Sequence, residues 1–339
     1  MPGPSPCLPS QFSSICCWPS SRCRKPVAAS WKRSRPIFWE KAMAERQPRV
    51  RIGVDAGASK TRVVALEATG SLIGAANGPA ATLNGRADTA WRTVQETIRA
   101  IAPLEAVDPA AMRVVVGIAG TEIATAYRAF CDSAPAWGSL SVVSDAHVAC
   151  AGAHDGRDGA IVAVGTGVVG FCRHAGDSTR VGGWGFPHDD RGSGAWLGME
   201  AVGHALAAAD GRRPRDTLAE QVLAAYDDDP GTLAAWACTA DAGAFARHAR
   251  LVAERAAAGE AHATALIGEA AVHVSAVARA LIGERAGLAL ALTGGLAETV
   301  APWLDADLAS RLTPAVHDGA HGAALMAGEQ TYSTTESNS

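Results

Sequence analysis

The chain has 339 residues, 48% of them hydrophobic and 19% charged, which is typical of a folded globular protein and not of a disordered or collagen-like one. At roughly 100–200 residues per domain, this length predicts two domains. The formal net charge of −4 gives no support to nucleic-acid binding. No uninterrupted apolar run reaches the ~18 residues of a membrane helix, so we expect neither nucleic acid nor membrane as a partner.

The first 42 residues differ in composition from the rest. They carry seven basic residues against one acidic residue, so the chain from Met43 onward has a net charge of −10. A Ser/Arg-rich, acid-poor segment is typical of transit peptides, but this one is rich in proline. The second hypothesis is that translation begins at Met43 and that 1–42 is an over-extended reading frame. We therefore expect 1–48 to be a disordered or mis-annotated N-terminal extension.

From Met43 the predicted elements alternate between strands and helices, which indicates an α/β fold. We expect a first domain over 49–150 and a second over 151–328, followed by a disordered polar tail at 329–339. The expected strands are 49–55, 61–67, 71–76, 112–118, 140–144, 159–164, a hairpin over 171–180, and 287–292. The expected helices are 86–102, 195–209, 215–226, 243–257, 261–284 and 319–327.

The four remaining cysteines are scattered at Cys131, Cys150, Cys172 and Cys238 and form no CxxC pair. This pattern predicts neither a zinc site nor a disulfide framework, and it fits a reducing cytoplasm.

A tight turn of small residues joins the first two strands and carries Asp55, Gly57, Ser59, Lys60 and Thr61. Small residues let backbone N–H groups approach an anion, and a carboxylate at a strand end can hold Mg²⁺ or its water molecules. The Walker loop is excluded, because it needs Gly before the Lys and a helix after it. Lys60 is the only lysine after Lys41, which favours a function for its compact ammonium. The alternative is a surface lysine in a β-turn.

A second glycine loop, Gly165-Thr166-Gly167-Val-Val-Gly170, follows an apolar strand and matches G-x-G-x-x-G. A dinucleotide-binding fingerprint must open a helix. The residues that follow predict a strand, so NAD binding is disfavoured.

The segment Gly182–Gly198 is rich in glycine and contains Gly183, Trp184 and two adjacent carboxylates, Asp189 and Asp190. An indole face and carboxylates on a loop suit a sugar, which offers C–H groups for stacking and hydroxyls for hydrogen bonds. The alternatives are an ordinary loop with its tryptophans in the core, and a metal site that includes His188.

Two further motifs bear on chemistry. Asp145 ends a strand and enters a helix, where it would act either as a general base or as a helix N-cap. Near the C-terminus a strand runs into Gly294-Gly295, an opening where a base or ribose would fit.

These motifs in this order resemble the actin-like ATPase and sugar-kinase superfamily, and within it the N-acetylglucosamine and glucosamine kinases grouped with the BadF/BadG/BcrA/BcrD-type ATPases. The resemblance covers 50–328. It implies two ribonuclease-H-like domains around a central cleft, ATP and Mg²⁺ as cofactors, an amino sugar as substrate and a homodimer.

The resemblance also implies residue roles. Asp145 would be the base that takes a proton from the sugar's 6-hydroxyl, and Asp55 would hold the metal. ATP and its phosphates would contact Gly57, Ser59, Lys60, Thr61, Gly165, Thr166, Gly167, Gly294 and Gly295. The sugar would contact Asn84, Asp145, Gly183, Trp184 and Asp190.

The chain departs from the family pattern at two places. Ala56, Ala58 and Ser59 stand in the first loop where the family has two glycines and a threonine. The family's Gly-Asp-Glu-Gly-Ser is here 189–193, Asp-Asp-Arg-Gly-Ser, in which the extra acid favours an unacetylated amino group and Arg191 disfavours it. The alternative functions are a BadF-type ATPase activator, which needs cysteines for an iron–sulfur cluster, and a non-catalytic sugar or ATP sensor.

Overall fold

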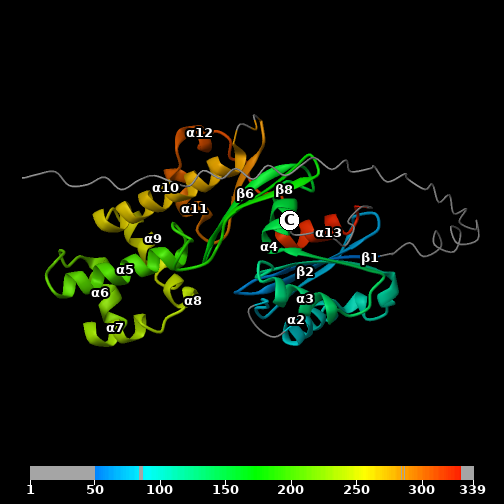
Figure 1. Cartoon of the computed structure of the whole chain (residues 1–339), viewed down its shortest axis with the longest axis horizontal. Coiled ribbons are helices and arrows are strands. Elements are labelled where there is room, and N and C mark those ends of the chain that lie inside the picture. The colour runs from blue at the N-terminus through cyan, green and yellow to red at the C-terminus, as the bar shows by residue number, and fades with distance from the viewer. Residues whose placement is uncertain (1–49, 84–86, 284, 286, 330–339) are drawn as a thin grey trace, which may run out of the picture. The chain divides into compact units, whose positions relative to one another are not determined.

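The computed structural model describes residues 50–83, 87–283, 285 and 287–329. The expectations for 1–48 and for the tail beyond Glu329 fall outside these residues. The described part contains two β-sheets with helices on their faces (Figure 1).

The first sheet has five strands in the order β3-β2-β1-β4-β5. Their bounds are β1 Val50–Ala56, β2 Thr61–Glu67, β3 Leu72–Gly78, β4 Met112–Ile118 and β5 Ser139–Ser144. Strand β1 is antiparallel to β2 and parallel to β4. Its apolar residues and those of β4 are buried almost without interruption, because helices cover both faces of the sheet.

Helix α2 (Ala87–Arg99) packs on one face of this sheet, and α3 (Ala124–Asp132) packs on α2 through the stacked rings of Trp91 and Phe130. Helices α4 (Asp145–Ala153) and α13 (Gly319–Met326) contact the strands on their other side. At Gly53 of β1, a Cβ would collide with the backbone of α13, so a glycine is needed for this close approach.

The second sheet has four strands in the order β8-β7-β6-β9. Their bounds are β6 Gly159–Val164, β7 Val168–His174, β8 Asp177–Gly182 and β9 Leu290–Thr293. Helices α4 and α10 (Ala261–Ile282) both pack on this sheet. Helix α4 therefore contacts both sheets.

The remaining helices all belong to the second half of the chain. They are α5 Gly194–Ala209, α6 Thr217–Ala224, α7 Pro230–Ala237, α8 Ala242–Ala246, α9 Ala249–Ala257, α11 Ala297–Val300 and α12 Ala306–Ala309. Short 3₁₀ turns lie at Ala102–Leu104, Pro109–Ala111 and Ala301–Trp303.

The two sheets repeat one pattern. Each begins with three antiparallel strands joined in sequence, and the next strand pairs parallel with the first of the three, β4 with β1 and β9 with β6. The predicted mixed α/β class with two sheets is therefore confirmed. The division at residue 150 stays a prediction, and α13, from the second expected domain, packs on the first sheet.

The prediction of one helix over 243–257 was wrong, since the structure has two helices, α8 and α9, with a break at Arg247 and His248. Both helices bury apolar side chains toward α5, so the hydrophobic periodicity runs on across the break. Of the described helices, α10 is long and apolar enough to cross a membrane by length and composition, yet half of that stretch is buried inside the protein.

Candidate active site

The predicted first phosphate loop is a hairpin turn between β1 and β2. The amide of Gly57 donates to the carbonyl of Lys60 at 3.0 Å, and the side chains of Ser59 and Lys60 are exposed. Thr61 is completely buried, and its hydroxyl has no hydrogen-bond partner. A phosphate can therefore reach Ser59 and Lys60 in this conformation, whereas the hydroxyl of Thr61 is closed off.

Asp55 lies at the end of β1, directly opposite Arg62 of β2. Arg62 donates to Asp318 and to Asn77, and Asp55 has no hydrogen bond or ion pair to any of the residues that the structure describes. Burial raises the pKa of Asp55 to about 7, the carboxylates of Asp145 and Asp318 add to the rise, and Lys60 and Arg62 oppose it.

This environment fits a divalent cation. A half-buried carboxylate that lacks a donor and lies near other carboxylates is stabilised by a bound positive charge. Oxygen ligands of this kind are those that Mg²⁺ takes together with substrate phosphates.

Asp145 is the first residue of α4, at the carboxyl end of β5. The helix is capped by Ser144, whose hydroxyl accepts from the amide of His147 at 3.2 Å, so the alternative that Asp145 serves as the N-cap was wrong. The carboxylate of Asp145 instead accepts from the adjacent amide of Ala146 at 2.8 Å. Burial raises the pKa of Asp145, Glu122 adds to the rise, and Arg180 opposes it.

The second glycine loop, 165–167, connects β6 to β7. A strand follows it and not a helix, which confirms the reading against a dinucleotide fingerprint. Its carbonyls accept from the start of α5, Gly165 from the amide of Gly194 and Thr166 from that of Ala195. The loop is thereby fixed to the helix that ends the Gly182–Gly198 segment.

The carboxylate of Asp190 links the second glycine loop to the Gly182–Gly198 segment, which the sequence analysis predicts to bind the sugar. It is 8% exposed, accepts from the amide of Val168 at 3.1 Å, and lies against Gly167, where a Cβ would come within 2.8 Å of it. Burial raises the pKa of Asp190, and the Val168 hydrogen bond opposes the rise. Asp190 thus holds the loop directly.

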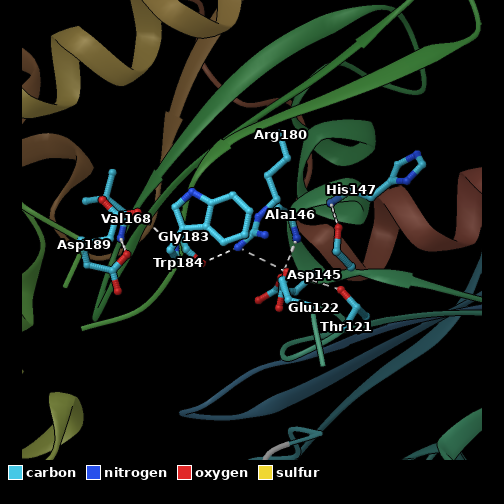
Figure 2. Close-up of polar contacts among 12 residues, drawn as sticks. Thr121, Glu122, Asp145, Ala146, His147, Val168, Arg180, Gly183, Trp184 and Asp189 are labelled. Atoms are coloured by element: carbon cyan, nitrogen blue, oxygen red, sulfur yellow. Dashed lines mark hydrogen bonds and ion pairs between the residues drawn. The ribbon is translucent and has the colours of Figure 1, made fainter. Parts of the chain in front are cut away.

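Trp184 is 77% exposed, so the alternative that places it in the core was wrong for this residue. Trp196 is buried, so the core alternative holds for that ring. The amide of Trp184 donates to Asp189 at 3.0 Å (Figure 2). Gly183 adopts a φ of +72°, a conformation that favours glycine.

Gly294 and Gly295 are both exposed after β9. Gly294 has a φ of +91°, and a Cβ there would collide with the backbone of Val164 at the end of β6. The opening after β9 therefore lies beside the strand that leads into the second glycine loop.

Asn84 lies outside the described residues. Its neighbour Leu83 donates its amide to the carbonyl of Ala119 at 2.9 Å, just beyond β4. His188 is exposed, and the carboxylates of Asp189 and Asp190 accept from backbone amides. Across the described ranges no group of three or more His, Cys, Asp or Glu side chains is arranged for a metal ion.

Four charged residues of the site were not found from the sequence. Arg62 and Asp318 flank Asp55, and Arg180 and Glu122 form an ion pair at 3.4 Å near Asp145. Arg180 comes two residues before Gly182-Gly183, which is the only local signal that the sequence offered for any of them.

The described residues form two sheets that repeat one strand pattern, and the two glycine loops and Asp145 lie at the ends of their strands. A family model described as the BadF/BadG/BcrA/BcrD ATPase family matches 52–327, and the chain belongs to this family. Its fold is that of the two-domain actin-like ATPases and sugar kinases, as predicted.

Two relatives and one solved structure indicate the class of activity within this family. The chain is similar to glucosamine kinase GspK of Vibrio cholerae, with 29% identity over 284 residues that cover 83% of this chain and 96% of that one. It is 32% identical over 178 residues to an N-acetylmuramic acid/N-acetylglucosamine kinase of Clostridium acetobutylicum, covering 51% of this chain and 58% of the relative. A solved structure from Chromobacterium violaceum, described as a candidate N-acetylglucosamine kinase, has 34% identity and a TM-score of 0.78 over 83% of this chain and 99% of its own. These relatives support an amino-sugar kinase.

Proposed function

We propose that this protein is an ATP-dependent kinase that transfers the γ-phosphoryl group of ATP to the 6-hydroxyl of glucosamine or N-acetylglucosamine. The observation that carries the proposal is the position of Asp145. Its carboxylate interacts electrostatically with Asp55 behind the first hairpin and with Arg180 beside the Gly183-Trp184 segment. A base in that position would stand between a phosphate loop and a sugar loop.

Asp145 acts as the general base in this proposal. Its carboxylate takes the proton of the 6-hydroxyl as the hydroxyl oxygen bonds to the γ-phosphorus, and the bond from that phosphorus to the bridging oxygen of ADP breaks. The pKa of Asp145 is raised by burial, which strengthens it as a base near neutral pH.

The remaining residues position the reactants and compensate charge, which is most of what phosphoryl transfer asks of a protein. Ser59, Lys60 and the amides of the second glycine loop would hold the phosphates. Mg²⁺ held by Asp55 would neutralise charge on the phosphate oxygens. Trp184 would stack on the sugar ring.

Two features of the 189–193 segment bear on the choice of sugar. Asp189 is partly engaged by the amide of Trp184, and Arg191 pairs with Glu269 at 3.0 Å on α10. Arg191 is thereby neutralised by a partner of its own, and the extra carboxylate of Asp189 remains beside Trp184. This charge balance supports glucosamine over N-acetylglucosamine as the acceptor. We place the enzyme in the cytoplasm, as a homodimer.

The test is release of ADP from ATP and Mg²⁺ with glucosamine, N-acetylglucosamine, glucose or no sugar, followed by identification of the phosphorylated position. We expect strong stimulation by an amino sugar and a 6-phosphate product. Asp145→Asn should lower kcat by at least about a hundredfold, whereas Asp177→Asn, which removes an exposed carboxylate at the far end of β8, should not. ATP hydrolysis that no sugar stimulates would instead support an ATPase activator or a sensor.

A further inference from the structure

The proposed sugar site, which we call the acceptor site, contains Trp184 and Asp145. The side chain of Arg180 lies between these two residues in Figure 2. It belongs to β8, and its side chain is 24% exposed. One guanidinium nitrogen donates to the carbonyl of Gly183 and also forms the 3.4 Å ion pair with Glu122.

The same guanidinium covers part of Trp184. Its central carbon lies 5.2 Å from the centre of the indole ring, within the range of a cation–π interaction. The exposed fraction of Trp184 is 77%, so most of the ring remains open to a ligand. Arg180 therefore fixes both the backbone of Gly183 and the orientation of the ring that follows it.

Glu122 belongs to a different part of the chain. It follows β4 of the first sheet and precedes α3, while β8 is an edge strand of the second sheet. The Arg180–Glu122 pair consequently ties the Gly183-Trp184 segment to the first sheet at the side chain of Asp145.

We infer that Arg180 is a positioning residue of the acceptor site, which orients Trp184 for the sugar ring, with Glu122 as its counter-ion. This inference rests on the proposed function.

The experiment measures kcat and KM for the amino sugar in four variants, with KM for ATP measured in parallel. Arg180→Met should raise KM for the sugar about tenfold and leave KM for ATP unchanged. Arg180→Lys keeps the charge but loses the shared contacts, so it should also raise KM for the sugar. Glu122→Gln removes the counter-ion, so it should raise KM for the sugar by less than Arg180→Met does. Arg250→Met, which removes an exposed arginine of α9, is the matched control.

An unchanged sugar KM in Arg180→Met would overturn the inference. So would equal changes in the sugar and ATP KM values, because that result indicates a general structural defect. If Arg180→Met does not fold, as judged by circular dichroism, Arg180→Lys and Glu122→Gln decide the matter. Failure of the proposed function is recognised separately, because the unaltered protein would then show no sugar-dependent release of ADP.

Discussion

Replacing Asp55 by Asn should stabilise the metal-free protein at neutral and alkaline pH while abolishing its response to Mg²⁺ and ADP. The wild-type carboxyl is held where burial and two other carboxylates disfavour its ionised form, so its pKa is about 7 in place of 3.8. An amide of the same shape carries no charge in that environment. Functional sites commonly contain such destabilising groups.

The size of the effect follows from the pKa. A rise of about three units corresponds to about 4 kcal/mol, at roughly 1.4 kcal/mol per unit. Asp55 is half-buried and not fully enclosed, and water therefore screens part of this cost. We expect about 2 kcal/mol in favour of the Asn variant, which is several degrees in Tm for a protein of this size.

The linkage between protonation and folding determines how the stability of the wild-type protein changes with pH. The folded-state pKa of Asp55 lies above its unfolded value, so folding favours the protonated carboxyl. The wild-type protein bears no penalty below about pH 4, loses stability between about pH 4 and pH 7, and bears the full penalty above pH 7. The difference in stability between Asp55→Asn and wild type should grow over that interval and then level off.

The assay is thermal unfolding of both proteins from about pH 4 to pH 8 in the presence of a chelator, then with Mg²⁺ and ADP at pH 8. Mg²⁺ with ADP should raise the Tm of the wild type and not that of the variant, because a ligand stabilises only the protein that binds it. Asp177→Asn controls for the loss of one negative charge. A stability difference that is constant across this pH range, or a variant less stable than wild type at pH 8, would refute the reasoning.

Two further substitutions test the loops. Gly294→Ala places a Cβ on a left-handed residue, against the backbone of Val164. This should lower the free energy of unfolding by at least about 2 kcal/mol and weaken ADP binding measured by calorimetry. At Gly295 a Cβ meets nothing within 4 Å, so Gly295→Ala should leave the ADP affinity intact. Asp190→Ala removes the side-chain acceptor of the buried Val168 amide, next to the second glycine loop, so it should reduce stability by about 1–3 kcal/mol and weaken both sugar and nucleotide binding. Asp189→Ala should weaken sugar binding alone, and equal effects of the two Asp variants on nucleotide affinity would contradict this division of roles.

The strands were predictable because their signal is local. The segments 61–67, 112–118 and 159–164 were predicted with the bounds that the structure has. Each is a short run of β-branched and small apolar residues bounded by turn residues, a pattern that depends only on neighbours in the sequence.

The charge network of the site was not predictable in the same way. Arg62 and Asp318 are 256 residues apart and pair because α13 packs on β1 and β2. No periodicity in either segment encodes the other. Asp190 illustrates the same limit at shorter range: composition marked it as polar and near a glycine loop, whereas its bond to the amide of Val168 depends on how that loop folds.

The position of Asp145 depends on the packing of one helix. Helix α4 contacts both sheets and also α13, and the contact with α13 is made through glycines: a Cβ at Gly152 would meet the backbone at Asp318, and one at Gly322 would meet the backbone of α4. The starts of α4 and α13 carry Asp145 and Asp318, and both carboxylates act on Asp55. The small residues of this contact therefore set how closely three carboxylates approach one another. Burial is the largest cause of the raised pKa of Asp55, and the two other carboxylates add to it, so the packing of α4 against α13 contributes to that pKa.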